Sequence, residues 1–246
     1  MGVIRSAIGD SVLTSMWVFN LPVIGLLAGR ASDFLRTHYI SLPFTGLFIT
    51  ILLATINVLL FTLLGTLLGG ASFNPSTTVS FHAAGLTKPG SSLISMAVRL
   101  PAQAAGGAIG AMGIWQVMPV GWLKGGPSLK VDWHTGALAE GLLAFAHCLS
   151  VLVVVVRGPR SVFVKVLLLA MVTTGLVRVG SGYTGPSLNP ANAFGWAYVK
   201  NWHNSLELYY VYWVGPLVGA TMAAWVFRVL FAPSLVKKKK KKKKRE

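Results

Sequence analysis

The fold is decided by two stretches of sequence, FNPSTTVSF at residues 73–81 and LNPANAFGW at residues 188–196. In each copy an Asn stands before a Pro and a mostly apolar run. Asn is a favoured N-cap, and Pro fits the first helical position because its missing N–H would be unpaired there anyway. The two copies therefore predict helices over 75–85 and 190–200. Helices of this length reach about 16 Å, roughly half the thickness of a bilayer core.

Longer apolar stretches surround these two short helices. They cover roughly residues 11–28, 43–68, 92–118, 135–156, 161–180 and 207–231, three in each half of the chain. Each is long enough for a transmembrane helix. An odd number of spans per half inverts the second half relative to the first, as in inverted-repeat transport proteins. We expect an all-α membrane protein with six transmembrane helices and two half-helices. Its predicted parts are a first repeat over 1–118, a second repeat over 119–232 and a disordered basic tail over 233–246.

The charge of the chain is low and unevenly distributed. Of 246 residues, 54% are hydrophobic and 11% are charged, about half the charged fraction of a typical soluble domain. The formal net charge of +16 is concentrated in eight consecutive lysines at 237–244. This run, together with the loop that holds Arg157 and Arg160, predicts that both termini face the cytosol. A lysine run is by default a solvated segment, and it also attracts anionic membrane lipid. We expect no nucleic-acid partner for a membrane-embedded chain.

Two half-helices that meet at their N-termini have a defined electrostatic effect. They place two partial positive charges of about +0.5 each at mid-membrane. A cation or proton meets a barrier there, whereas a neutral hydrogen-bonding molecule such as water does not. Each box Asn caps its helix and has amide N–H groups left to offer the lumen. The predicted pore motifs are Asn74, Pro75 and Ser76 in the first box and Asn189, Pro190 and Ala191 in the second.

Further segments extend the pattern beyond the two boxes. They are GYTGPSLNPA at 182–191 and WVGPLVGA at 213–220, with Asp10 in the first span, Gln103 in the third and Glu140 in the fourth. Together with the paired Asn-Pro boxes, they resemble the aquaporin (major intrinsic protein) family over nearly the whole chain. The Asn-Pro-Ser of the first box, the short N-terminus and the basic C-terminus are most similar to the type 1 branch of the plant small basic intrinsic proteins.

The resemblance implies an aquaporin fold and a passive water channel. It also implies a homotetramer in the endoplasmic reticulum membrane, with no cofactor and no enzymatic activity. The last residues resemble a dilysine retrieval signal formed by Lys243 and Lys244. Such a signal is read in the cytosol, in agreement with the predicted topology.

The selectivity filter departs from the family pattern. Members usually have Arg directly after the second box, and this chain has Asn192 there. Matching by distance from the box gives Val177 and Pro186 as further filter positions, and Thr55 as the fourth, with Ala54 as the alternative. Such a ring carries no charge, so the half-helix ends remain the main barrier to cations. Arg178 is next to Val177, but adjacent helical residues point about 100° apart. We therefore expect Arg178 to face away from the pore and to snorkel or bond loop carbonyls.

Other polar residues in the apolar spans have structural interpretations. Asp10 and Glu140 are expected to accept hydrogen bonds from the half-helix loops, and Arg99 to snorkel to the cytosolic face. His82 is expected to be packed or weakly pore-adjacent. No metal-ligand cluster or catalytic nucleophile–base pair is evident. GxxxG pairs at Gly65/Gly69, Gly106/Gly110 and Gly215/Gly219 predict close helix crossings between the halves.

The sequence leaves the cargo open. Water conduction is the leading hypothesis, and transport of another small neutral solute, such as glycerol, urea or hydrogen peroxide, is the first alternative. Ala193 after Asn192 weakens the glycerol alternative, since glycerol facilitators often carry Asp at that place. A secondary transporter lacks support because no coupling acid is evident. A non-conducting membrane scaffold is the remaining alternative.

Overall fold

The protein is all helix in the part of the chain that the structure describes. The structure, a computed structural model, describes residues 2–39, 43–87, 93–123 and 126–243, with side chains up to Phe231 except Val120. The helices are α1 (Val3–His38), α2 (Thr45–Leu67), α3 (Pro75–Ala83), α4 (Leu93–Val117), α5 (Trp133–Arg157), α6 (Val162–Gly180), α7 (Pro190–Val199), α8 (Leu206–Tyr209) and α9 (Gly215–Lys243). A π-helical turn, Tyr210–Val214, joins α8 to α9.

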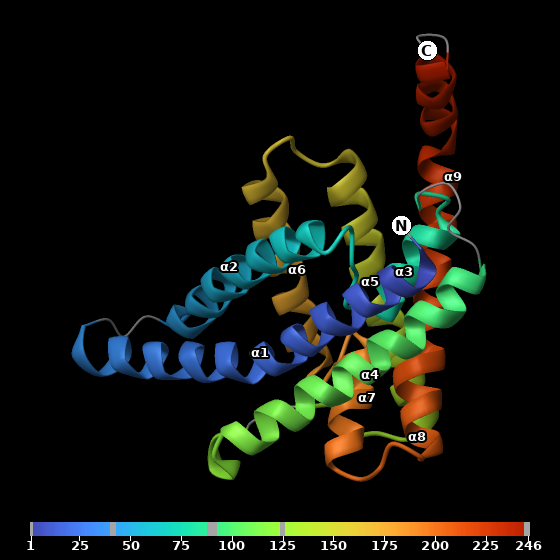
Figure 1. The fold of residues 1–246 in the computed structure, drawn as a ribbon. Helices are drawn as coiled ribbons and strands as arrows, with labels where there is room; N and C mark the ends of the chain where they lie inside the picture. The colour runs from blue at the N-terminus through green and yellow to red at the C-terminus, as the bar shows by residue number, and fades with distance from the viewer. Residues whose placement is uncertain (1, 40–42, 88–92, 124–125, 244–246) are drawn as a thin grey trace.

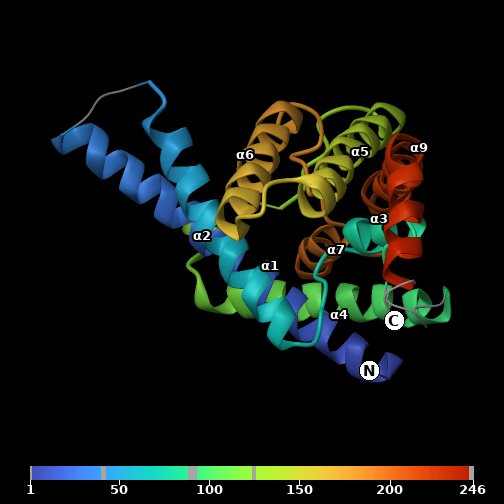
Figure 2. The ribbon, with the colours of Figure 1, turned by 90° about the horizontal axis from the view of Figure 1, so that it is seen from above.

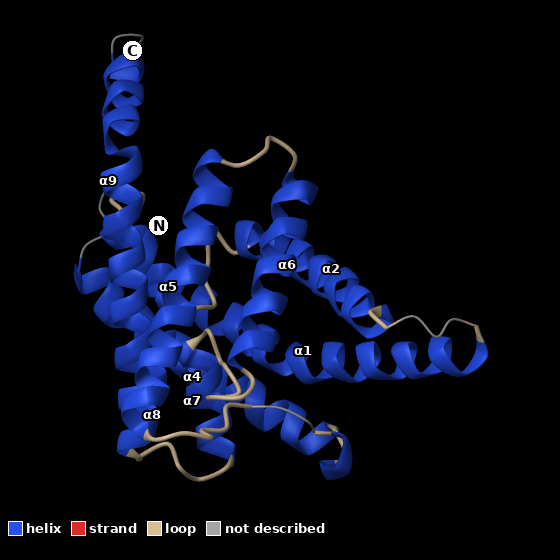
Figure 3. Cartoon of the chain, turned by 180° about the vertical axis from the view of Figure 1, so that it is seen from behind, coloured by secondary structure: helices blue, strands red, loops and turns tan. Residues whose placement is uncertain are grey.

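Two short helices lie among longer ones, as the sequence predicts. Figure 2 shows α3 and α7 in the middle of the molecule, with α4 on one side and α5 and α6 on the other. Helix α3 ends where Gly85 adopts a φ of +70°. The N–H of Leu86 then bonds the Phe81 carbonyl at 3.0 Å, a closure typical of a helix that ends at a glycine. Figure 3 shows the loops that lead into these helices running through the centre of the helical assembly.

Among the residues that the structure describes, five helical segments are long and apolar enough to cross a membrane: α1, α2, α5, α6 and Leu206–Phe231. Helix α4 corresponds to the third of the six expected spans, residues 92–118, and has 25 residues. It is not among the helices that are apolar enough to qualify. Its length of about 37 Å is still sufficient to cross a bilayer core. Helix α4 contains Arg99, Gln103 and several glycines because it faces other helices rather than lipid over much of its surface.

Two helices extend beyond the stretches that the sequence predicts. The first span was expected over 11–28, yet α1 runs from Val3 to His38, since the helix continues past the apolar part. Figure 1 shows the end of α1 and the start of α2 projecting together away from the other helices. Helix α9 continues into the lysine run as far as Lys243, where a disordered segment was expected. Lys244, the second residue of the expected retrieval signal, lies outside the described residues.

Glycines on α4 allow it to pack closely against α1. A Cβ added at Gly106 would lie 2.2 Å from the Ser11 carbonyl oxygen, and one at Gly110 would lie 2.2 Å from that of Ser15. Real Cβ atoms essentially never approach within 3.0 Å. Only glycine therefore permits this crossing, which is the small-residue packing predicted from the GxxxG spacing.

The second half repeats this packing between α9 and α5. A Cβ added at Gly219 would lie 2.0 Å from the Gly141 carbonyl oxygen, and Gly215 approaches α5 in the same way. Both crossings join helices of the same half, so the expectation that these glycine pairs pack between the halves was wrong. In the remaining pair, Gly65/Gly69, Gly69 is not helical and has a φ of +78° in the turn after α2. Its role is conformational, because this backbone geometry favours glycine.

Candidate functional site

The two box asparagines begin the half-helices. The Oδ1 of Asn74 accepts a hydrogen bond from the N–H of Ser76 at 2.9 Å. The Oδ1 of Asn189 accepts one from the N–H of Ala191 at 3.0 Å. Pro75 and Pro190 each occupy the first turn, where a missing N–H costs nothing. The predicted N-caps are confirmed, and both asparagine side chains are almost fully buried.

Each asparagine also binds the loop that leads into the opposite half-helix. The Nδ2 of Asn74 donates to the Leu188 carbonyl at 2.9 Å, and the Nδ2 of Asn189 donates to the Phe73 carbonyl at 2.9 Å. Leu188 and Phe73 are the residues directly before the two asparagines, so the contacts are reciprocal. One N–H of each amide is therefore used by the protein, and each amide has a second N–H. The sequence did not anticipate this mutual connection.

The N-termini of α3 and α7 thus lie against each other at the centre of the molecule. Their partial positive ends add at one place because the two helices approach head to head. The side chains there are neutral amides, a hydroxyl and prolines. Such a centre disfavours a cation and permits hydrogen bonds to a neutral molecule.

Asp10 connects three elements of the first half. Its carboxylate accepts hydrogen bonds from the Ser72 N–H at 2.8 Å and from the Gln103 Nε2 at 2.8 Å. It also forms a two-point ion pair with Arg99, whose Nε and Nη2 lie 2.7 and 2.8 Å from the two carboxylate oxygens. Gln103 further donates to the Thr78 hydroxyl on α3. This network fixes the approach to the first box against α1 and α4.

The position of Arg99 corrects the sequence interpretation. It was expected to snorkel to the cytosolic face, but its side chain is 16% exposed and paired with Asp10, which is 0% exposed. A buried carboxylate is stable as a charge only with such a partner, and that requirement outweighs snorkelling. The signal was available: Arg99 precedes Gln103 by four residues and shares its helical face.

Glu140 has the corresponding place in the second half. One carboxylate oxygen accepts from the Thr184 hydroxyl at 2.8 Å and from the Ser187 N–H at 3.1 Å. Its other oxygen is buried and has no partner among the described residues. Glu140 thus holds the loop before the second box, as Asp10 holds the loop before the first, but without an arginine partner there.

The predicted filter residues lie on different elements, α2, α6, α7 and the loop before α7. Thr55 is buried on α2, and its hydroxyl donates to the Ile51 carbonyl at 2.7 Å. The Nδ2 of Asn192 donates to the Ser187 hydroxyl at 3.1 Å, next to Pro186. Val177 lies on α6 and lines a surface groove. The closure of these four side chains into one ring stays a prediction.

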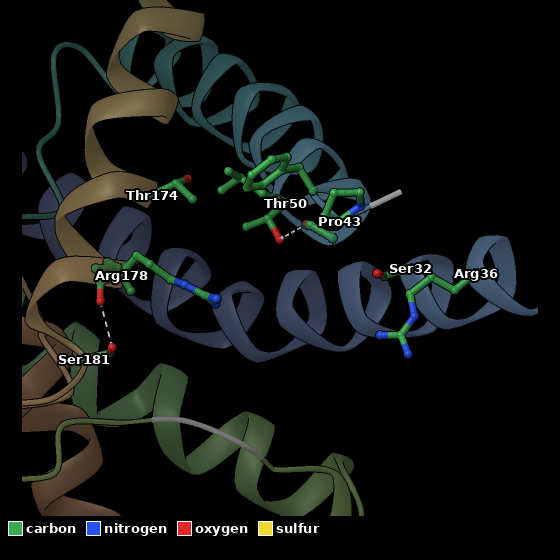
Figure 4. Close-up of a pocket in the computed structure, with 11 residues that line it drawn as sticks. Ser32, Arg36, Pro43, Thr50, Thr174, Arg178 and Ser181 are labelled. Carbon is green, nitrogen blue, oxygen red and sulfur yellow. Dashed lines mark hydrogen bonds between the residues drawn. The ribbon is translucent and has the colours of Figure 1, made fainter. Parts of the chain in front are cut away.

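The groove beside Val177 has a volume of about 850 Å³ and lies between α1, α2 and α6. Figure 4 shows Arg178 extending from α6 across this space toward α1. Its lining residues are Ser32, Arg36, Pro43, Phe44, Gly46, Leu47, Thr50, Thr174, Val177, Arg178 and Ser181. Arg178 therefore lines the same groove as Val177, and the expectation that it faces away from the pore stays a prediction. A groove this wide accommodates two side chains that point about 100° apart.

Further observations concern single polar residues and potential metal ligands. His82 is half-buried on α3, and its Nδ1 has no partner within the described residues. No group of three or more potential metal ligands occurs in the part of the chain that the structure describes. Ser187 was missed by sequence reasoning, although it touches both Glu140 and Asn192. Its position two residues before the second box was the available signal.

The geometry defines a class of protein: a helical membrane protein with two capped half-helices that meet at its centre. Residues 3–227 match the family described as Major intrinsic protein. The chain therefore belongs to this family, whose members are channels for water or small solutes rather than enzymes.

Three relatives and one solved structure place the chain more closely. Aquaporin SIP1-1 of Oryza sativa subsp. japonica is 48% identical, over 95% of this chain and 96% of the relative. Aquaporin SIP1-1 of Arabidopsis thaliana is 44% identical, over 97% of each. Probable aquaporin SIP2-1 of Arabidopsis thaliana is 33% identical, over 95% of this chain and 94% of the relative. The aquaglyceroporin from Plasmodium falciparum shares the fold, with a TM-score of 0.67 at 19% identity, covering 94% of this chain and 98% of that one.

Proposed function

We propose that this protein is a passive water channel of an intracellular membrane, with an arginine-free filter formed by Thr55, Val177, Pro186 and Asn192. The observation that carries the proposal is the reciprocal bonding at the starts of α3 and α7, in which the Nδ2 of each box Asn donates to a carbonyl of the opposite loop. This arrangement leaves amide N–H groups and two helix N-termini at the centre, a combination suited to a neutral hydrogen-bonding molecule.

The test is osmotic shrinkage of proteoliposomes measured by stopped-flow light scattering. The wild type is expected to shrink faster than empty vesicles. Asn189→Ala, which removes the cap of α7 and the bond to Phe73, should lower the water permeability. Asn204→Ala is the matched control, because Asn204 is exposed and lies in the loop between α7 and α8, outside the box. Water permeability of the wild type equal to that of empty vesicles would reject the proposal.

A second candidate is conduction of another small neutral solute. It is favoured by Asn192, which is uncharged and uses one amide N–H to bind Ser187. Glycerol, urea and hydrogen peroxide uptake by the same vesicles tests this candidate. Uptake of one of these solutes, without osmotic shrinkage faster than that of empty vesicles, would favour solute conduction over water conduction. Absence of all fluxes would favour a non-conducting scaffold.

We further propose that the channel resides in the endoplasmic reticulum with both termini in the cytosol, and that it assembles as a homotetramer. The lysine run at 237–244 supports this orientation. Replacing Lys243 and Lys244 by serine should release the protein from the endoplasmic reticulum, whereas unchanged location would remove the retrieval hypothesis. Light scattering of the purified protein in detergent should give the mass of four chains; the mass of one chain would contradict the tetramer.

A further inference from the structure

Leu188, the residue directly before the second box, has a strained backbone. Its φ is +52°, in the left-handed region that residues other than glycine rarely adopt. A residue such as leucine is disfavoured there by about 5- to 30-fold. Such a conformation persists only where the surrounding contacts enforce it. The strain has a use, because the Leu188 carbonyl accepts the hydrogen bond from Asn74 of the opposite half.

Ser187 holds this strained turn at three points. Its N–H donates to the buried Glu140 carboxylate at 3.1 Å, and its hydroxyl donates to the Asn189 carbonyl at 2.6 Å. The hydroxyl oxygen also accepts from the Nδ2 of Asn192 at 3.1 Å. Both hydroxyl bonds reach residues on the far side of Leu188, so they close a small ring around the strained residue.

Asn192, at the other end of this contact, is 7% exposed. Its Oδ1 is buried and has no partner among the described residues. The bond from its Nδ2 to Ser187 is therefore the one hydrogen bond that orients the Asn192 amide within the described part of the chain. Without the serine hydroxyl, both ends of this amide would be unpaired.

The first half has a corresponding serine with a different connection. Ser72 also lies two residues before its box, and its N–H donates to the Asp10 carboxylate at 2.8 Å. Its hydroxyl accepts from the Thr78 hydroxyl at 2.8 Å, on the half-helix α3. Phe73, the counterpart of Leu188, does not have a positive φ. The combination of a strained turn and a bond to a proposed filter residue is thus a feature of the second half.

We propose that Ser187 is the positioning residue of the proposed filter. Its hydroxyl fixes the orientation of Asn192 and stabilises the left-handed Leu188, whose carbonyl connects to the first box. The inference rests on the proposed place of Asn192 in the filter. It makes the orientation of a filter side chain and the meeting of the two half-helices depend on one hydroxyl group.

The first test measures backbone hydrogen exchange by mass spectrometry in peptides covering residues 184–193 of the full-length protein in detergent. Ser187→Ala should speed this exchange by about 2- to 12-fold, the factor that corresponds to the loss of one hydrogen bond. Ser187→Thr keeps the hydroxyl and should exchange like the wild type. Ser181→Ala is the matched control, because it removes a hydroxyl that is bonded to the Arg178 carbonyl, outside the box.

A double-mutant cycle tests whether Asn192 acts through the serine. Asn192→Ala should speed the exchange in the wild-type background and add nothing in the Ser187→Ala background, because its side-chain bond is already lost there. An equal additional effect of Asn192→Ala in both backgrounds would overturn the inference.

The second test measures urea and water fluxes of the same variants in proteoliposomes. Ser187→Ala should raise the urea-to-water permeability ratio at least about twofold, the lower end of the same factor, because an untethered Asn192 yields to a solute wider than water. A variant that only reduces the fraction of folded channels lowers both fluxes alike and leaves this ratio unchanged.

The outcomes separate this inference from the proposed function. Exchange in Ser187→Ala no faster than in Ser181→Ala overturns the inference, and so does faster exchange with the wild-type flux ratio. Wild-type water flux at the level of empty vesicles rejects water conduction alone. The hydrogen-exchange cycle then decides by itself whether Ser187 positions Asn192.

Discussion

Gly107 provides a direct test of how the second half-helix is held. It lies on α4, and a Cβ added there would be 2.1 Å from the carbonyl oxygen of Ala191, a residue of the second box. The approach is reciprocal, since a Cβ added at Gly195 on α7 would lie 2.3 Å from the Gly107 carbonyl oxygen. In Gly107→Ala the backbone of α7 must retreat by at least 0.9 Å to restore the 3.0 Å that real Cβ atoms keep.

Overpacking of this kind costs about 1–3 kcal/mol of unfolding free energy. For a chain of this size each kcal/mol changes the thermal midpoint by about 2–4 °C. We expect Gly107→Ala to unfold about 2–12 °C below the wild type in detergent, followed by tryptophan fluorescence. Its water permeability per channel should also fall, because Ala191 is displaced together with the box.

Gly175→Ala is the matched control, since a Cβ added at Gly175 on α6 would meet nothing within 4 Å. Alanine is favoured over glycine within a helix by about 0.5–1 kcal/mol, so this variant should unfold at or slightly above the wild-type temperature. If Gly107→Ala is as stable as Gly175→Ala and conducts water normally, the close crossing of α4 and α7 is not what positions the second box.

Three further predictions concern polar contacts. Arg99→Met should destabilise the protein by about 3–5 kcal/mol, because it leaves the buried Asp10 carboxylate without its partner; the double variant with Asp10→Asn should recover part of this loss in thermal unfolding. Glu140→Gln keeps an oxygen acceptor for the Thr184 hydroxyl and should retain water permeability. Glu140→Leu has no such acceptor and should lose water permeability. Equal water fluxes through the two variants would show that Glu140 does not position the loop before the second box. The pKa of the Asp132 carboxyl is lowered from 3.8, chiefly by the hydrogen bond from the Thr135 side chain. This contribution to stability is present above the ordinary pKa and is lost as the pH falls through the lowered value. Asp132→Asn should therefore reduce the decrease of the melting temperature at acid pH. A melting temperature that depends on pH as in the wild type would contradict this prediction.

The architecture was predictable from local features of the sequence. An Asn before a Pro starts a helix whatever surrounds it, because the cap and the fixed φ act over neighbouring residues. The lengths of the apolar stretches and their number in each half then gave the two half-helices and the inverted repeat. The ends of the helices were less certain, because an apolar stretch marks only the part of a helix inside the membrane, and a helix can continue beyond it. Helix α1 accordingly runs well past residue 28.

The contacts between distant residues were not predictable in the same way. Asp10 was recognised as a structural carboxylate, but its pairing with Arg99 depends on which faces of α1 and α4 meet. The reciprocal bonds of Asn74 and Asn189 likewise join loops more than a hundred residues apart. Sequence spacing identifies such groups as donors and acceptors, while the packing of the helices selects the partner.

The sequence by itself determined that two capped half-helices lie in a membrane-embedded inverted repeat, because capping and hydropathy are local properties. Only the tertiary structure decided where the charge of Arg178 lies. Helical geometry alone indicated that its side chain points about 100° away from that of Val177. The separation of α1, α2 and α6 leaves a groove that both residues line. The width of a space between helices depends on their relative positions in three dimensions, and a helical repeat does not encode that width.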